Sequence, residues 1–183
     1  GLATRAGNPR EYLRRFMKNH PVAPKKLKKS NVTHLSLHPI PLGGPIPKTY
    51  SNGLLVVGDA ASQVKPTTGG GVIVGLSCSK IAGEVAYEAL KKNDFSETFL
   101  SQYQFRWKEL VGFDLAVMRQ IRQVLNRLSD DKVDKIIDLC VKLGVGGVLE
   151  EVGDLYFQGR SLIPMIKHPT SLVVMLYFIF SWL

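Results

Sequence analysis

The chain has 183 residues, of which 45% are hydrophobic, and a formal net charge of +9. It is long enough for one compact domain, or one domain with an appendage, and its basic balance suits a polyanion, a phosphorylated ligand or an anionic membrane surface. The two cysteines, Cys78 and Cys140, lie far apart and form no CxxC pair, and the four histidines form no HExxH motif. We therefore expect no disulfide framework, no metal site and a reducing cytoplasm.

The first predicted elements are a helix and a strand on either side of a basic segment. Residues 9–19 predict an amphipathic helix, because one face gathers the apolar side chains of Tyr12, Leu13, Phe16 and Met17. The segment PKKLKKS (24–30) predicts a loop that is either a solvated linker or a patch facing a membrane or a phosphate. Residues 32–38 alternate apolar or β-branched with polar side chains, which predicts a strand that ends at the following prolines.

A second strand and a glycine-led helix follow a tight turn at Ser51-Asn52-Gly53. The apolar run LLVV (54–57) lies between glycines and predicts a strand buried on both faces of a layered α/β domain. In the next helix small residues recur every four positions, at Gly71, Gly75, Ser79 and Gly83. This spacing predicts a narrow stripe where another backbone approaches closely.

The remainder of the chain predicts helices. Residues 94–128 carry large apolar side chains at helical intervals, and residues 129–144 predict a helix with Ser129 as its N-cap and Gly144 as its C-cap. Cys140 lies on the apolar face of that helix and is expected in the core rather than as a reactive thiol.

Two glycine-containing or apolar segments near the C-terminus carry weaker signals. Residues 144–154 contain glycines but no GxGxxG motif, so they predict a turn. Residues 171–183 are almost uninterrupted apolar, yet shorter than the roughly 20 residues that span a bilayer. They are compatible with a buried helix, an interfacial anchor or a hydrophobic lid.

The stretch VVGDAASQVKPTTGGG (56–71) places the carboxylate of Asp59 after the predicted buried strand and three glycines before a helix. Ligands of open α/β sheets bind at the carboxyl ends of strands, and a helix start offers unpaired N–H groups and the positive end of the helix dipole. The pattern predicts a negative group on these amides and a hydroxyl at Asp59, as in a phosphorylated ribose or ribityl ligand. The alternative is a plain strand–turn–helix in which Asp59 is a structural cap.

The segment GLLVVGDAASQVKPTTGGGVIVGL (53–76) resembles the second FAD-binding motif of the geranylgeranyl reductase family, flavoproteins with a fold like p-hydroxybenzoate hydroxylase. The lead-in IPLGGPIPKTY (40–50), the Ser-Asp-Asp helix start (129–131) and the apolar C-terminus are also similar to that family. Aromatic hydroxylases of the same fold usually carry a histidine where this chain has Ser62, and GQG where it has three glycines.

The resemblance implies an α/β fold, α+β in this part, with three regions. Residues 1–52 would end a substrate-binding region, residues 53–92 would form the C-terminal part of a Rossmann-like FAD-binding domain, and residues 93–183 a helical region with an apolar tail. The family's N-terminal half with GxGxxG is absent, and the chain has no initiator Met or signal peptide. We therefore expect a C-terminal portion of a longer enzyme that alone binds FAD weakly or not at all.

The resemblance also implies a set of residues that hold FAD: Gly58, Asp59, Pro66, Thr67, Thr68, Gly69, Gly70 and Gly71. Asp59 would accept a hydrogen bond from a ribityl hydroxyl, Gly58 would admit the ligand to the backbone, and Pro66 with the two threonines would shape the loop beside the isoalloxazine. The amides of the three glycines would face the pyrimidine edge and favour negative charge on reduced flavin. No residue is identified as the proton donor.

The family reduces isolated C=C bonds of isoprenoid chains, delivering a hydride to one carbon and a proton to the other. The resemblance thus implies an FAD-dependent reductase of geranylgeranyl chains in lipid biosynthesis, with an isoprenoid lipid as substrate and a reduced nicotinamide or a ferredoxin as electron donor. We expect a cytoplasmic protein with peripheral membrane contact through residues 171–183.

Three alternatives stay open at the level of sequence. One is another FAD-dependent oxidoreductase of the same fold, such as an electron-transfer dehydrogenase or a halogenase. Another is a non-catalytic, membrane-associated helical module. Nucleic-acid binding through Lys25–Lys29 is the weakest, because aromatic residues are not interleaved with that basic cluster.

Overall fold

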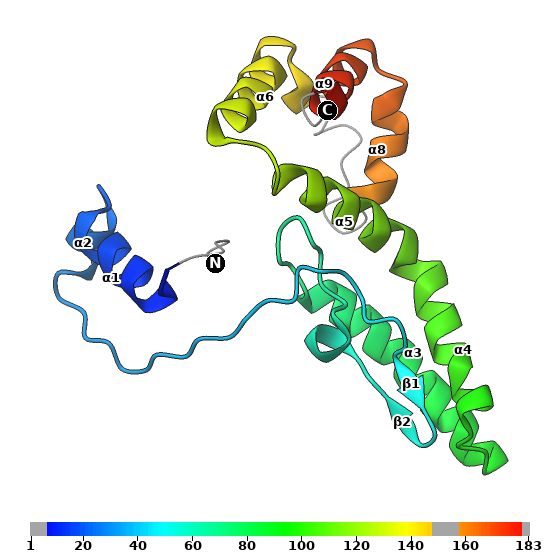
Figure 1. Cartoon of the computed structure of the whole chain (residues 1–183). Helices are drawn as coiled ribbons and strands as arrows, with labels where there is room; N and C mark the ends of the chain where they lie inside the picture. The colour runs from blue at the N-terminus through cyan, green and yellow to red at the C-terminus, as the bar shows by residue number, and fades with distance from the viewer. Residues whose placement is uncertain (1–6, 148–157, 181–183) are drawn as a thin grey trace. The chain divides into compact units, whose positions relative to one another are not determined.

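The computed structural model describes residues 7–147 and 158–180 (Figure 1). The chain divides into two compact units, Gly1–Pro39 and Ile40–Leu183. The division predicted from the sequence, at residues 52/53 and 92/93, separates regions by function rather than by compactness and stays a prediction.

The first unit contains two short helices, α1 (Pro9–Asn19) and α2 (Ala23–Leu27), which pack against each other. The predicted helix over residues 9–19 is confirmed. Its start is stabilised by Asn8, whose side chain accepts a hydrogen bond from the Arg10 N–H at 3.0 Å, and by a proline in the first turn.

Two expectations for the first unit are wrong. The basic segment 24–30 is helical in its first half, as part of α2, rather than a loop. The strand predicted over residues 32–38 is absent: this segment has no regular secondary structure, and its residues are exposed. A strand is stable only when it pairs with a neighbour, and β pairing within the described residues is confined to residues 50–55.

The second unit begins with a two-stranded antiparallel sheet, β1 (Tyr50–Ser51) and β2 (Leu54–Leu55), joined by the predicted tight turn. The strand predicted over residues 54–57 is wrong in extent and environment, because β2 ends at Leu55 and Leu54 is 53% exposed. A short apolar run shows that a segment is partly buried, but does not specify its strand partners. The described residues are mostly helical, and they contain this small sheet in place of the layered parallel sheet.

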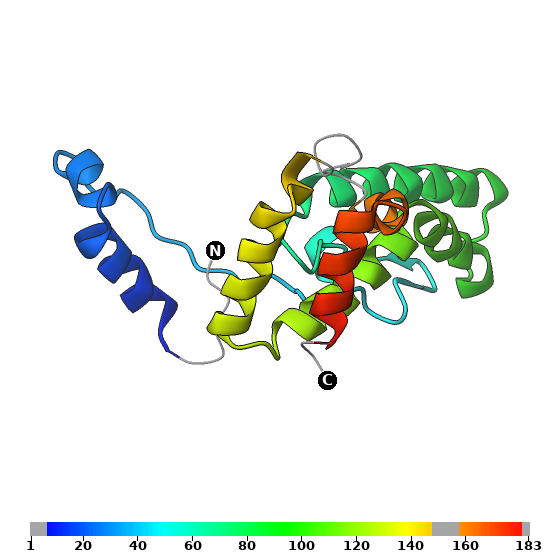
Figure 2. The same ribbon diagram turned by 90° about the horizontal axis from the view of Figure 1, so that it is seen from above.

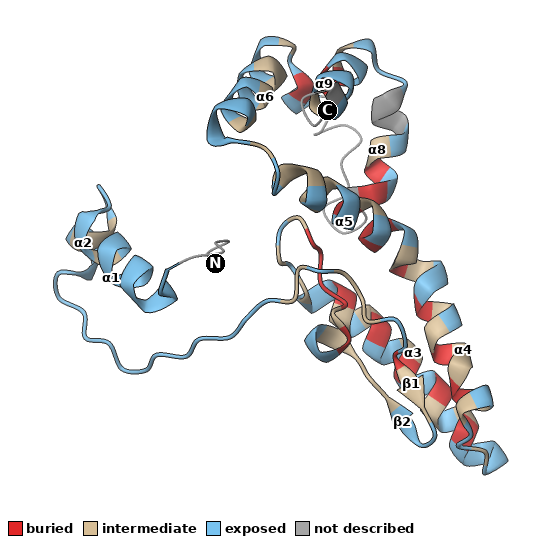
Figure 3. Ribbon diagram, viewed as in Figure 1, coloured by how far each residue is buried: buried red, intermediate tan, exposed pale blue. Residues whose placement is uncertain are grey.

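Helix α3 (Val72–Lys92) packs against α4 (Glu97–Trp107) to form the main core. A π-helical turn, η2 (Lys108–Gly112), connects α4 to α5 (Phe113–Leu125), so the helix predicted over residues 94–128 is confirmed with one local irregularity. Figure 3 shows the buried positions facing inward along these helices. The buried residues of this core are Val74, Cys78, Ala82, Val85, Ala89, Leu100, Tyr103, Trp107, Val111, Leu115 and Met118.

The last helices form a second, smaller cluster: α6 (Asp130–Lys142), α8 (Gln158–Ile166) and α9 (Pro169–Phe180). Helix α9 packs against both α6 and α8 (Figure 2). Cys140 is half-buried in this cluster, as a core-facing residue rather than a fully buried one.

The ends of α6 follow the predicted signals in part. Ser129 occupies the N-cap position but makes no side-chain capping bond, and Gly144 follows the helix with φ +65°. Of the turn predicted over residues 144–154, only residues 144–147 are described: Gly144 lies in a turn, and residues 145–147 are helical. Residues 148–154 and 181–183 lie outside the described ranges. Within residues 7–147 and 158–180, no helix is both long and apolar enough to cross a membrane.

Candidate functional site

The Gly-Asp pair lies in a single 3-10 turn, η1 (Gly58–Ala61). Gly58 has φ +68°, a conformation that strains other residues, and an added Cβ there would meet nothing within 4 Å. The turn closes through Ser62, also left-handed at φ +53°, whose N–H donates to the Asp59 carbonyl oxygen at 2.9 Å. This geometry leaves the Asp59 side chain exposed to solvent at the surface of the turn.

A buried pair, Gln63 and Tyr103, fixes this turn to helix α4. The Gln63 Oε1 accepts the Gly58 N–H at 2.9 Å, and its Nε2 donates to the Tyr103 hydroxyl oxygen at 3.0 Å. The Tyr103 hydroxyl in turn donates to the Val56 carbonyl oxygen at 3.0 Å. Burial raises the pKa of Tyr103 to about 12, so it stays a protonated donor at neutral pH.

Our sequence interpretation missed this support. The available signal was an uncharged amide, Gln63, between apolar residues and next to a predicted binding motif. Buried amides require partners, because leaving one unsatisfied costs about 1–3 kcal/mol.

A second buried contact holds the segment that leads into the sheet. The Trp107 Nε1 donates to the Thr49 Oγ1 at 2.9 Å, and the Thr49 N–H donates to the Gln104 Oε1 at 2.9 Å. Thr49 and Trp107 are both essentially inaccessible to solvent. Helix α4 therefore positions both the lead-in and the Gly-Asp turn.

The glycine-rich loop is closed by its own backbone. The Lys65 N–H donates to the Gly70 carbonyl oxygen at 3.1 Å, and the Gly69 N–H donates to the Lys65 carbonyl oxygen at 2.9 Å. The Gly70 N–H points to the Thr68 Oγ1 at 3.4 Å. Two of the three glycine amides expected to face a ligand are thus engaged within the loop, and Pro66 is buried beneath it.

Further backbone N–H groups lie at the start of helix α3. The first N–H groups of a helix have no intrahelical acceptor, and here they follow Gly71, the N-cap. Val72 in the first turn is 75% exposed, so the helix start faces solvent. Thr68 is exposed and Thr67 is half-buried at the rim of the same loop.

The Asp59 carboxylate lies directly against this helix start. A Cβ added to Gly71 would lie 3.0 Å from the Asp59 Oδ1 and 3.2 Å from the Val64 Cγ2, so the position favours glycine. Among the described residues, none donates a recorded hydrogen bond to the Asp59 carboxylate. One exposed acceptor and several helix-start donors therefore lie side by side, and the positive end of the helix dipole favours a negative group there.

The stripe of small residues explains how the helix is aimed. A Cβ added to Gly75 would lie 3.7 Å from the Gly58 Cα, so α3 approaches the Gly-Asp turn at backbone distance, as the four-residue repeat predicts. Later in the helix the repeat does not mark a close approach of another backbone, because Ser79 and Gly83 are exposed.

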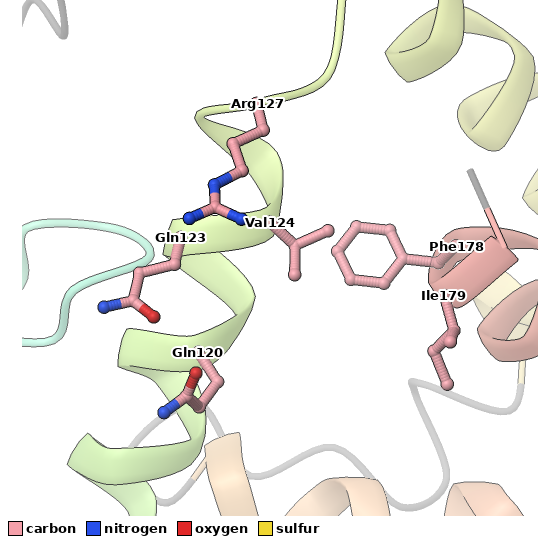
Figure 4. A pocket seen from close by; sticks show the side chains of 6 residues that line it. All are labelled: Gln120, Gln123, Val124, Arg127, Phe178 and Ile179. Atoms are coloured by element: carbon pink, nitrogen blue, oxygen red, sulfur yellow. The ribbon is translucent and has the colours of Figure 1, made fainter. Parts of the chain in front are cut away.

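A cavity of about 450 Å³ lies apart from these residues, between α5 and α9. In Figure 4, Val124 and Phe178 point toward each other across it. Its lining combines polar and apolar side chains: Gln120, Gln123, Val124, Arg127, Phe178 and Ile179. None of the predicted site residues lines this cavity, and no sequence motif pointed to it.

No family model matches the chain. It is 44% identical over 128 residues to a digeranylgeranylglycerophospholipid reductase of Methanocaldococcus jannaschii, which is 70% of this chain and 32% of that protein. It is 37% identical over 163 residues to the reductase of the same name from Methanococcus vannielii, 89% of this chain and 39% of that protein. The chain thus spans a third or slightly more of the length of these relatives.

A solved structure also matches part of this chain. A protein of Thermoplasma acidophilum described as geranylgeranyl bacteriochlorophyll reductase-like superposes with a TM-score of 0.61 at 31% identity. The superposition covers 71% of this chain and 32% of that chain.

Proposed function

Because this chain is related to the geranylgeranyl reductase family, as its motif predicts, we propose that it forms the ribityl-binding corner and helical region of an FAD-dependent reductase. The reaction is saturation of C=C bonds in the geranylgeranyl chains of lipids. The proposal concerns a protein that also carries the other two thirds of the relatives' length. The relatives' names favour this reductase over the halogenase and electron-transfer alternatives.

The single observation that carries the flavin assignment is the contact between Asp59 and the start of α3. The Asp59 Oδ1 lies 3.0 Å from the position of a Cβ on Gly71, and a Cβ added to Gly58 would meet nothing within 4 Å. An acceptor beside helix-start donors fits the ribityl hydroxyls and the polar pyrimidine edge of FAD. The eight residues predicted to hold FAD contribute unequally, because the Gly69 and Gly70 amides are engaged within the loop.

Bound FAD supplies a hydride for one carbon of the double bond, and a proton reaches the other. The residues of this chain would bind and orient the flavin: Asp59 would accept a hydrogen bond from a ribityl hydroxyl, and the amides at Gly71 and Val72 would hold the pyrimidine edge. The positive end of α3 stabilises negative charge at that edge. Tyr103 is no proton donor in this scheme, because it is buried and its hydroxyl bonds to the Val56 carbonyl.

The partners follow from the same proposal. The substrate is an isoprenoid lipid, and a reduced nicotinamide or a ferredoxin supplies the electrons. Helix α9 exposes apolar side chains, among them Val173, Leu176 and Ile179. These support peripheral membrane contact by residues 171–183 of a cytoplasmic protein.

The test joins this chain to the other two thirds of the M. jannaschii reductase. The hybrid is expected to purify with flavin and to add two hydrogens per double bond to digeranylgeranylglycerophospholipid, measured by absorbance and mass spectrometry. Asp59→Ala and the milder Asp59→Asn should lower flavin content, whereas Asp134→Ala, an exposed carboxylate on α6, should leave it unchanged. A folded hybrid without flavin, or equal flavin in the Asp59 and Asp134 variants, would reject the proposal.

A further inference from the structure

The positive charge of the chain is concentrated in its first unit. Residues 1–39 contain nine Lys or Arg and one acidic residue, Glu11, which makes +8 of the total of +9. Residues 40–183 are therefore close to neutral, at +1. A segment this basic attracts an anionic surface over about one Debye length.

Helix α1 combines this charge with an exposed apolar face. Tyr12, Leu13 and Phe16 lie on one side of the helix and are 39–51% exposed. The other side carries basic side chains, and the Arg15 guanidinium lies 5.9 Å from the centre of the Tyr12 ring. The basic residues of α1 are Arg10, Arg14, Arg15 and Lys18. Apart from the half-buried Met17, every residue of α1 is exposed (Figure 3).

Helix α2 adds more cationic side chains to the same small unit. It packs against α1 and carries Lys25 and Lys26, with Lys28 and Lys29 just after it. Leu27 on this helix is also exposed. The two helices together therefore present apolar side chains in a strongly basic setting.

We propose that α1 and α2 dock onto the surface of an anionic lipid membrane. An amphipathic helix with basic residues and exposed Tyr, Leu and Phe is the type that lies in the plane of a membrane interface. Lys and Arg side chains add electrostatic attraction to anionic lipids, which falls with salt. The inference goes beyond the proposed function and does not depend on flavin binding.

Charge and pattern favour a membrane over other occupants. A single-stranded nucleic-acid surface would interleave stacking aromatics with the basic residues. On α1, Tyr12 and Phe16 lie together on the apolar side, and Arg15 lies beside the Tyr12 ring at the edge of that side. Helix α9, in contrast, is apolar on almost all sides and partly packed against α6 and α8, and the basic residue just before it is Lys167. It has the apolar surface but lacks the charge that would select anionic lipid.

The test measures co-sedimentation of the 183-residue chain with vesicles. Vesicles of phosphatidylcholine with phosphatidylglycerol should bind the chain, pure phosphatidylcholine vesicles should bind it at least tenfold more weakly, and high salt should weaken the first binding. Phe16→Glu should reduce binding to the anionic vesicles at least tenfold. The matched control, Phe105→Glu on α4, changes an aromatic that is 68% exposed in the second unit and should have no effect.

A second pair of variants tests the charge. Arg14→Gln with Lys18→Gln should weaken binding by about tenfold or more, whereas Lys135→Gln with Lys142→Gln on α6 should leave it unchanged. Circular dichroism checks that the variants keep their helices, which is expected because the substituted side chains are exposed.

Four results would overturn the proposal. These are equal binding to both vesicle types, equal loss in the Phe16 and Phe105 variants, loss in Leu176→Glu on α9 without loss in Phe16→Glu, or tighter binding to duplex DNA than to vesicles. The Asp59→Ala chain should bind vesicles like the unmodified chain, so failure of the flavin proposal and failure of this one are distinguishable.

Discussion

The glycine corner, residues 49–107, and the described part of the helical tail, residues 130–147 and 158–180, are held in different ways. In the corner, large apolar residues are fully buried, and the buried polar side chains of Gln63, Tyr103 and Thr49 all have partners. In the tail, Val145 and Val174 are the buried members of the described cluster, and the buried Ser171 hydroxyl has no recorded partner. Several independent contacts thus specify the corner, whereas fewer specify the tail.

Among the described residues, α5 and α8 form a close junction between the tail and the rest of the second unit. The Asp114 side chain is 2% exposed; its Oδ1 accepts the Arg160 N–H at 2.8 Å, and its Oδ2 lies 3.3 Å from the Arg160 Nε. The Arg160 guanidinium also donates to the Leu110 carbonyl oxygen at 2.8 Å, in the π-helical turn. A Cβ added to Gly159 would lie 2.6 Å from the Asp114 Cα, so only glycine fits there without displacement. Gly159 therefore allows α8 to approach α5 closely, and the Asp114–Arg160 contacts hold it there.

The largest effect is expected in the corner's core. Trp107→Ala removes a fully buried ring and its hydrogen bond to Thr49, and should lower the free energy of unfolding by about 3–5 kcal/mol. Phe105→Ala, two residues earlier on the exposed side of α4, should change it by less than about 0.5 kcal/mol. Urea denaturation measures both. Similar losses in the two variants would show that α4 does not organise the corner as described.

The junction of the tail is the next most sensitive point. Gly159→Ala forces a methyl group against the α5 backbone and should cost about 1–3 kcal/mol, with faster amide hydrogen exchange in α8 and α9 than in α3. Gly83→Ala is the matched control, because an added Cβ there meets nothing within 4 Å and α3 should gain roughly 0.5–1 kcal/mol. Uniform exchange changes in both regions would contradict a separable tail.

A smaller loss of unfolding free energy is expected when the hydroxyl that bridges the Gly-Asp turn and α4 is removed. Tyr103→Phe leaves the Val56 carbonyl without its donor and the Gln63 Nε2 without its acceptor, and should cost about 1–1.5 kcal/mol. Tyr87→Phe, on the exposed side of α3, should be neutral within about 0.5 kcal/mol. Thermal or urea unfolding compares the stabilities of the two variants. Equal losses of stability would show that the Tyr103 hydroxyl does not help to hold the corner.

The smallest expected effect on stability comes from the cysteines: Cys78 lies in the corner and Cys140 in the tail. Burial raises the pKa of Cys78 from 9.0 to about 12, so the folded state keeps the thiol protonated. This contribution to stability is complete below pH 9 and is lost as pH rises from 9 toward 12. At pH 9.5 the loss is about 0.8 kcal/mol relative to pH 7.

The difference in urea unfolding between the two pH values includes this contribution, together with that of Cys140, whose pKa is also raised by burial. Cys78→Ala should remove this part of the pH dependence, while Cys140→Ala should retain it. Labelling with a thiol reagent should be faster at the half-buried Cys140 than at Cys78. A reversed order of labelling would mean that the tail is better protected than the corner.

Periodicity in the sequence predicted the helices α1, α3, α4, α5 and α6, whereas it did not specify α8 and left α9 open between a buried helix, an anchor and a lid. The apolar spacing in residues 9–19, the small residues before α3 and the glycine after α6 act within one or two helical turns, so their signals are local. The same reasoning failed for residues 32–38 and 54–57. A strand's existence and environment depend on pairing partners elsewhere in the chain, and a short apolar run does not identify them.

At the candidate site, the sequence predicted the residues of the proposed flavin corner, namely Asp59 and the glycines that follow it. Only the tertiary structure decided that the Asp59 carboxylate meets the helix start at Gly71, and that the loop uses the Gly69 and Gly70 amides itself. It also decided the bond between Gln63 and Tyr103, which are 40 positions apart. Local conformation follows from neighbouring side chains, whereas such contacts depend on how whole helices pack, and that packing is a property of the folded chain.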